Sequence, residues 1–167
     1  IVKLVEENAS PDELTGEMVR IGRIVFMVLG IIWCGFAVFG REFVVLWAGI
    51  ENADAYYVTL ILMSAYIFVL TESVGTQILW AMNQHKEQAI LKIVIVVVNI
   101  ALTILLIKWN PLIGATIGTF ISLMLGDVVV MNLIFKKKMH ISLAQYYDRL
   151  FKGILPCLGF VLIVGYG

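Results

Sequence analysis

Three ionisable residues interrupt long apolar stretches of this sequence, where a charge is unusual. Glu72 is the only charged residue between Asp54 and Lys86, and Asp127 is the only one between Lys108 and Lys136. Lys92 stands at the start of another apolar run. Because ionisable groups inside a membrane are costly, such residues commonly mark ion or substrate pathways and proton relays.

Helical spacing places other polar residues beside these three. Residues three, four, seven, eight or eleven positions apart share a helix face. The side chains aligned in this way are Thr76 with Glu72, Lys92 with Asn99 and Thr103, and Thr116 and Thr119 with Asp127. Two hypotheses fit these stripes: a hydrated path for a polar substrate or coupling cation, or hydrogen bonds and ion pairs between helices, such as Glu72 or Asp127 with Lys92.

The composition requires that the elements carrying these residues lie in a membrane. Of the 167 residues, 61% are apolar and 14% are charged, whereas soluble domains contain about 45–50% and about 25%. The 12 basic residues balance the 12 acidic ones, so there is no basic surplus of the kind that binds nucleic acid. A soluble enzyme and a nucleic-acid binder are therefore excluded.

The apolar stretches predict an all-α, polytopic bundle of transmembrane helices. About 20 apolar residues span the hydrocarbon core. We expect four complete spans and a fifth that is truncated at the end of the sequence, preceded by a cytoplasmic amphipathic connector helix over residues 1–20 that starts at a capping box on Ser10. The predicted bundle, 21–167, has spans at about 21–40, 56–82, 89–107, 111–135 and 149–167.

Basic residues favour the cytoplasmic side of a membrane and give the bundle its orientation. One end carries ten of the 12 basic residues, namely Lys3, Arg20, Arg23, Lys86, Lys92, Lys136, Lys137, Lys138, Arg149 and Lys152, and the other end carries Arg41 and Lys108. The loops at 84–88 and 136–147 are therefore predicted to be cytoplasmic. Within this basic end, Arg20, Arg23, Lys86 and Lys136 are candidates for attracting a diphosphate, although the positive-inside rule alone also explains them.

No constellation for catalysis or metal binding is present in the sequence. Cys34 and Cys157 lie separately in apolar runs, and His85 and His140 have no metal-binding partner at helical spacing. A nucleophile beside a base and a glycine-rich phosphate loop are also missing. We therefore expect a non-enzymatic protein without a metal or cofactor.

Three stretches of the chain resemble the bacterial polysaccharide-unit flippases of the multidrug/oligosaccharidyl-lipid/polysaccharide exporter superfamily. The loop GREFVVLWAG at 40–49 is similar to that family's G-x-E-F-[IV]-x-L-W-x-G, and Asn83–Lys86 matches its A-x-N-[KQ]-H-K turn. Asn99 then precedes Ile113–Thr119, which is similar to I-G-A-[AT]-I-G-T. In that family, uncharged polar residues are more frequent at the positions of Glu72 and Asp127, so the role of these two is not transferred.

This resemblance implies that the chain is a fragment from the C-terminal lobe of a two-lobed transporter, with further helices outside the fragment. It would flip undecaprenyl-diphosphate-linked oligosaccharide units across the bacterial cytoplasmic membrane for O-antigen, capsule or exopolysaccharide assembly. The implied partners are the lipid-linked oligosaccharide, membrane lipids, the missing helices and polysaccharide polymerase machinery.

Other functions stay open beside the flippase. A cation-coupled multidrug exporter of the same superfamily would use Glu72 and Asp127 as coupling carboxylates. A glycan polymerase or ligase would need a long outer loop with Arg and His, whereas the outer loops expected here, 41–55 and 108–110, are short. A scaffold subunit without transport activity is a further alternative.

Overall fold

A computed structural model describes residues 10–83, 85–152 and 154–166, and these residues are almost entirely helical. The helices are α2 (Pro11–Ala48), α3 (Ala55–Thr71), α4 (Ser73–Ala81), α5 (His85–Leu106), α6 (Pro111–Leu123), α7 (Met131–Met139), α8 (Leu143–Phe151) and α9 (Ile154–Tyr166), with a short 3-10 turn η1 (Ile50–Asn52) and a π-helical segment η2 (Met124–Val130). The predicted all-α fold is confirmed.

Within the described part of the chain, four helical stretches are long and apolar enough to cross a membrane, as predicted. They are Pro11–Ala48, Ala55–Ala81, Gln88–Leu106 and Pro111–Met139. Large apolar side chains cover their outer surfaces, including Ile31, Ile93 and Val97, each more than half exposed. An apolar exterior of this kind suits lipid as the surrounding solvent. The protein is therefore a multi-pass membrane protein.

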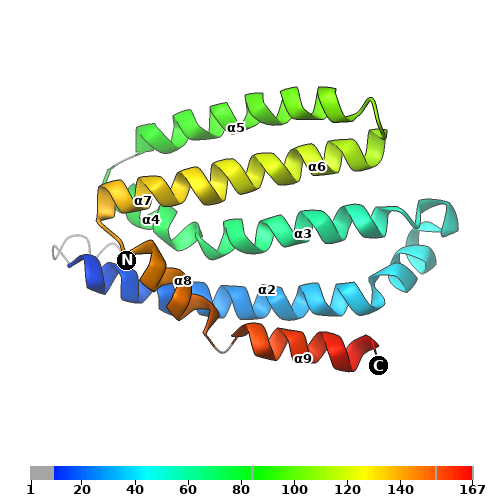
Figure 1. The fold of residues 1–167 in the computed structure, drawn as a ribbon, viewed down its shortest axis with the longest axis horizontal. Helices are drawn as coiled ribbons and strands as arrows, with labels where there is room; N and C mark the ends of the chain where they lie inside the picture. Colours follow the sequence, from blue (N-terminus) through cyan, green and yellow to red (C-terminus); the bar gives the residue numbers. More distant parts are fainter. Residues whose placement is uncertain (1–9, 84, 153, 167) are drawn as a thin grey trace.

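The long helices form one layer in which α5 and α6 run antiparallel, as do α3 and α2, whereas α6 is parallel to α3 and α9 is parallel to α2 (Figure 1). Across the layer the order is α5, α6, α3, α2 and α9, and each neighbouring pair is in contact. The helix formed by α6, η2 and α7 thus lies between α3 and α5, although it follows both in the sequence. Short α8 crosses α2 near the end of the bundle where α4 and α7 lie (Figure 1).

The predicted boundary near residue 20 does not separate two helices. Ser10 caps α2 through the expected capping box with Glu13, but the helix then continues without a break to Ala48. Leu14 and Met18 belong to the main buried cluster instead of lying along the membrane surface. Residues 1–9 of the predicted connector are outside the described range. The connector is therefore the first part of the first long helix.

The chain after the fourth span also differs from the prediction. In place of a loop at 136–147, α7 continues to Met139 and α8 starts at Leu143. The last helix begins at Ile154, and the predicted start near Arg149 falls within α8. The physical reason is the apolar face of α8, where Tyr146 and Leu150 are fully buried against the bundle.

Two small residues let α6 approach α5 closely. A Cβ atom added to Gly114 would lie 2.3 Å from the carbonyl oxygen of Leu106, and one added to Gly118 would lie 3.1 Å from the backbone nitrogen of Thr103. Glycine therefore allows direct backbone contact at this interface, and small residues commonly have this role between membrane helices.

Candidate functional site in the basic half of the bundle

Glu72 lies at an interruption between two helices. Glu72 lies between the end of α3 at Thr71 and the start of α4 at Ser73, so the second span is not one regular helix. Its side chain is 3% exposed and accepts hydrogen bonds at Oε1 from Asn132 Nδ2, at 2.7 Å, and from the hydroxyl of Tyr147. One carboxylate therefore joins the second span to α7 and α8.

The Tyr147 hydroxyl can act as a hydrogen-bond donor to this carboxylate. Burial raises the pKa of Tyr147 above its ordinary value. The phenol therefore keeps its proton over the physiological pH range. Tyr147 also accepts a hydrogen bond from Asn132 Nδ2 at 2.6 Å, which closes a network of three side chains.

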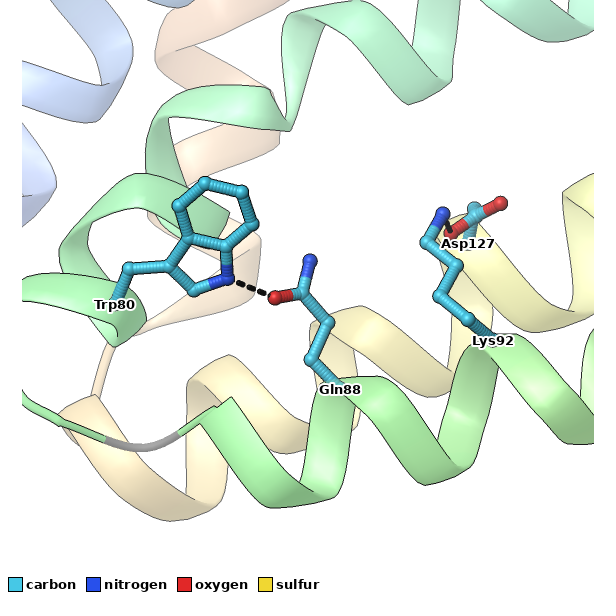
Figure 2. A network of polar contacts seen from close by, with 4 residues as sticks. All are labelled: Trp80, Gln88, Lys92 and Asp127. Atoms are coloured by element: carbon cyan, nitrogen blue, oxygen red, sulfur yellow. Dashed lines mark hydrogen bonds and ion pairs between the residues drawn. The ribbon is translucent and has the colours of Figure 1, made fainter.

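Asp127 forms an ion pair with Lys92, one of the two pairings considered from the sequence. Lys92 projects from α5, and Asp127 lies in the π-helical segment η2, where it is 8% exposed (Figure 2). The side chain of Lys92 is 51% exposed. π-helical turns inside α-helices are rare, and those that occur are often found at functional sites.

Gln88 and Trp80 extend this polar row toward the end of the bundle. The indole nitrogen of Trp80 donates to Gln88 Oε1 across the turn between α4 and α5 (Figure 2). Gln88 and Lys92 are one helical turn apart on α5, and their side chains project to the same side in Figure 2. The row thus contains an aromatic ring, an amide, an ammonium group and a carboxylate.

The predicted stripe farther along α5 makes a bond between helices. Asn99 Nδ2 donates to Thr119 Oγ1 at 3.4 Å, and Thr103 Oγ1 donates to Asn99 Oδ1 at 3.1 Å. Thr116 is buried and donates to Leu112 O within its own helix, whereas Thr76 is half-buried on α4. These threonines and Asn99 are thus separate from the Glu72 network.

The four predicted cationic residues are exposed on the chain surface. Arg20 forms an ion pair with Glu17 at 3.5 Å, and Arg23 Nη2 donates to the backbone oxygen of Lys152 at 3.2 Å. Lys86 and Lys136 are exposed near the ends of α5 and α7. Arg23 therefore helps to hold the segment after α8, in addition to contributing positive charge.

Sequence reasoning missed Asn132, Tyr147 and Gln88. The signal for Asn132 was present, since it is an uncharged polar residue inside the predicted span 111–135. Tyr147 falls in the predicted loop 136–147, and its partner Glu72 is 75 residues away in the sequence. Spacing along one helix cannot identify a partner at such a separation.

The described residues contain no group of three or more His, Cys, Asp and Glu side chains that could hold a metal ion. Cys34 is a buried free thiol, while the side chains of Cys157 and His85 are outside the described part. Taken together, the fold and the buried polar groups define a multi-pass membrane protein with charges held between its helices.

Comparison of the chain with protein-family models, with curated proteins and with solved structures finds no match.

Proposed function

We propose that this chain forms part of a flippase that moves undecaprenyl-diphosphate-linked oligosaccharide units from the inner to the outer leaflet of the bacterial cytoplasmic membrane. The proposal rests on the motifs at 40–49, 83–86 and 113–119, and on the polar groups placed between the spans. The function is transport for cell-surface polysaccharide assembly, and no covalent bond has to break.

The observation that carries the proposal is the half-exposed Lys92 beside buried Asp127. A lysine ammonium facing hydrocarbon is unfavourable, so charged residues in spans usually face the protein interior or a hydrated cavity. Lys92 is 51% exposed on a span whose other exposed residues are mostly apolar. This supports a hydrated surface along α5, completed by other parts of the transporter.

The substrate's chemistry explains why such a surface is needed. A diphosphate and several sugars cannot enter hydrocarbon without losing their hydrogen bonds to water, at several kcal/mol for each unsatisfied group. A polar cavity that opens alternately to each side replaces those bonds, and the lipid tail remains in the bilayer. Lys92 offers a positive charge for the diphosphate, and Gln88 offers an amide for sugar hydroxyls.

The basic end of the bundle supports recognition at the cytoplasmic leaflet. Arg23, Lys86 and Lys136 are exposed at this end, and a positive surface attracts an anionic headgroup over roughly one Debye length, about 10 Å. The same residues satisfy the positive-inside rule, which applies to any membrane protein whose cytoplasmic end is this one. They therefore contribute attraction, whereas discrimination between substrates falls to groups inside the bundle.

Reconstitution in proteoliposomes tests the proposal. The complete protein is inserted into vesicles that contain a fluorescent lipid-linked oligosaccharide, and a membrane-impermeant quencher reports the leaflet in which the dye lies. We expect protein-dependent movement of the lipid-linked sugar and no uptake of cationic dyes. Absence of sugar-lipid movement in vesicles with correctly folded protein would refute a flippase.

A cation-coupled multidrug exporter is the second candidate, and one observation favours it. Two carboxylates, Glu72 and Asp127, are buried among the spans, as a coupling mechanism requires. The same vesicles distinguish the two candidates. An exporter would move cationic dyes in response to an ion gradient and leave the sugar-lipid in place.

A further inference from the structure

The second oxygen of the Glu72 carboxyl has no partner among the described residues. Oε1 accepts hydrogen bonds from Asn132 and Tyr147, but no described donor reaches Oε2, which is fully buried. The whole side chain is 3% exposed. An ionised carboxylate in this position would leave a buried, charged oxygen without a described donor, which is strongly unfavourable.

The amide oxygen of Asn132 also lacks a hydrogen-bond partner. It is buried and has no described partner, although Nδ2 of the same amide donates to Glu72 Oε1 at 2.7 Å. Oδ1 and Nδ2 share a carbon atom, as do Oε1 and Oε2. The contact thus brings together an amide and a carboxyl that each retain one unsatisfied acceptor. One hydrogen between these two acceptors would satisfy both.

We propose that Glu72 binds a proton on Oε2 and donates it to Asn132 Oδ1, which makes a cyclic acid–amide pair with two hydrogen bonds. The ligand of this site is a single proton, taken from water and returned to it without other chemistry. The neutral pair removes the buried charge and joins the α3–α4 interruption to α7. This site is independent of which substrate the protein moves.

A metal cation fits these atoms less well than a proton. Metal ions of the sizes common in proteins take several ligands and favour charged carboxylates, and the described residues contain no group of three or more His, Cys, Asp and Glu side chains that could hold one. The ion pairs between described residues join Lys92 to Asp127 and Arg20 to Glu17, so no described cation pairs with Glu72.

The titratable groups around Glu72 come from two elements. Asp127 of η2 acts on it through its charge, and Tyr146 and Tyr147 face it from α8. Burial raises the pKa of both tyrosines, so they stay protonated near neutral pH. Asp127 has Lys92 as its counter-charge. Glu72 is therefore the group of this cluster to which we assign the proton.

Infrared difference spectroscopy of the full chain in lipid nanodiscs tests the site. A protonated carboxylic acid has a carbonyl band that is distinct from the carboxylate bands. We expect this band in the wild type at neutral pH, its loss in Glu72→Gln and its shift in Asn132→Leu, where the acceptor is removed. Asp127→Asn, which removes the other buried carboxyl among the described residues, is the matched control and should keep the band.

Three results would overturn the proposal. They are a wild type without the band at neutral pH, a band that survives Glu72→Gln, and a band that sodium chloride abolishes when potassium chloride does not, which would indicate a cation in place of the proton.

Thermal unfolding gives a second measure that does not depend on spectral assignment. The amide of Glu72→Gln can donate to Asn132 Oδ1 as the bound proton does, so we expect its melting temperature at neutral pH to stay within about 2 °C of the wild type, a change below about 1 kcal/mol. A markedly lower melting temperature would show that the wild type needs the ionised carboxylate and would contradict the proton site.

Discussion

Lys92 and Asp127 bring opposite charges together between α5 and η2, and their exposures differ. Asp127 is 8% exposed while half of the Lys92 side chain is accessible. Removal of the lysine therefore leaves a buried carboxylate without its counter-charge, whereas removal of both charges leaves no such defect.

A double-mutant cycle tests this pair. We expect Lys92→Met alone to lower the free energy of unfolding by about 2 kcal/mol, and Lys92→Met with Asp127→Asn to recover most of that loss. The measurement is reversible unfolding in detergent micelles. Additive effects of the two substitutions would show that the charges do not interact.

The neighbouring tyrosines of α8 provide a matched comparison. Tyr147 donates to Glu72, whereas the buried hydroxyl of Tyr146 has no partner among the described residues. Loss of a hydrogen bond to a carboxyl destabilises by about 1–3 kcal/mol, while removal of an unpartnered buried hydroxyl is close to neutral.

Tyr147→Phe should therefore lower the melting temperature clearly, and Tyr146→Phe should change it little. The phenyl ring remains in both variants, so packing is preserved. Equal effects of the two substitutions would contradict the assigned donor.

Individual polar residues were partly predictable from the sequence. Helical spacing placed Lys92, Asn99 and Thr103 on one face, and Asn99 and Thr103 are hydrogen-bonded to each other. Spacing could not show that Glu72 would contact Asn132, 60 residues away, because that contact depends on which helices are neighbours.

The interface between α5 and α6 depends on backbone contact at a glycine. The carbonyl oxygen of Leu106 would lie 2.3 Å from a Cβ on residue 114, and a backbone atom cannot move aside as a flexible side chain can. Gly35 of α2 has no atom within 4 Å of such a Cβ.

Alanine substitution at these two glycines should therefore have opposite effects. Gly114→Ala is expected to destabilise by about 1–3 kcal/mol through overpacking. Gly35→Ala should be neutral or stabilise by up to about 1 kcal/mol, because alanine is the better helix former. Thermal unfolding of both variants in the same detergent checks the prediction, and a stable Gly114→Ala protein would refute the close contact.

The positions of the spans were predictable, but interruptions within them were not. Hydropathy reports the type of each side chain and not the geometry of the backbone. It therefore does not mark the interruption at Glu72 or the π-helical segment. Both features depend on tertiary packing, as where Gly126 lies against Ile95. The helix α8 was missed because its short apolar face lies next to charged residues.

The order of helices across the layer could not be predicted for a related reason. In a soluble bundle, the apolar side of each helix faces its neighbours, whereas in a membrane bundle the apolar side also faces lipid. Along α5, Val97 and Ile100 are exposed while Leu91 and Ile95 are buried, although all four are apolar. The sequence therefore predicts that consecutive spans run in opposite directions, but it does not predict which spans are neighbours in the layer.

The orientation of the whole layer has a direct test. The end that carries Lys137 is predicted to be cytoplasmic and the end that carries Lys108 to be outside. In a background without Cys34 and Cys157, a cysteine at position 108 should react with an impermeant maleimide added to intact cells, and one at 137 should react only after permeabilisation. The reverse pattern would invert the orientation.

The central claim is that the ionisable groups buried between the spans, Glu72 and Asp127, serve translocation. Measuring sugar-lipid flipping by the protein with Glu72→Gln and Asp127→Asn combined, at equal amounts in vesicles, tests it most directly. In this variant, position 72 has no acidic proton to release and Lys92 has no counter-charge. We therefore predict that the flipping rate falls at least about tenfold, which corresponds to a barrier that is higher by about 1.4 kcal/mol. A rate equal to that of the wild type would contradict the claim.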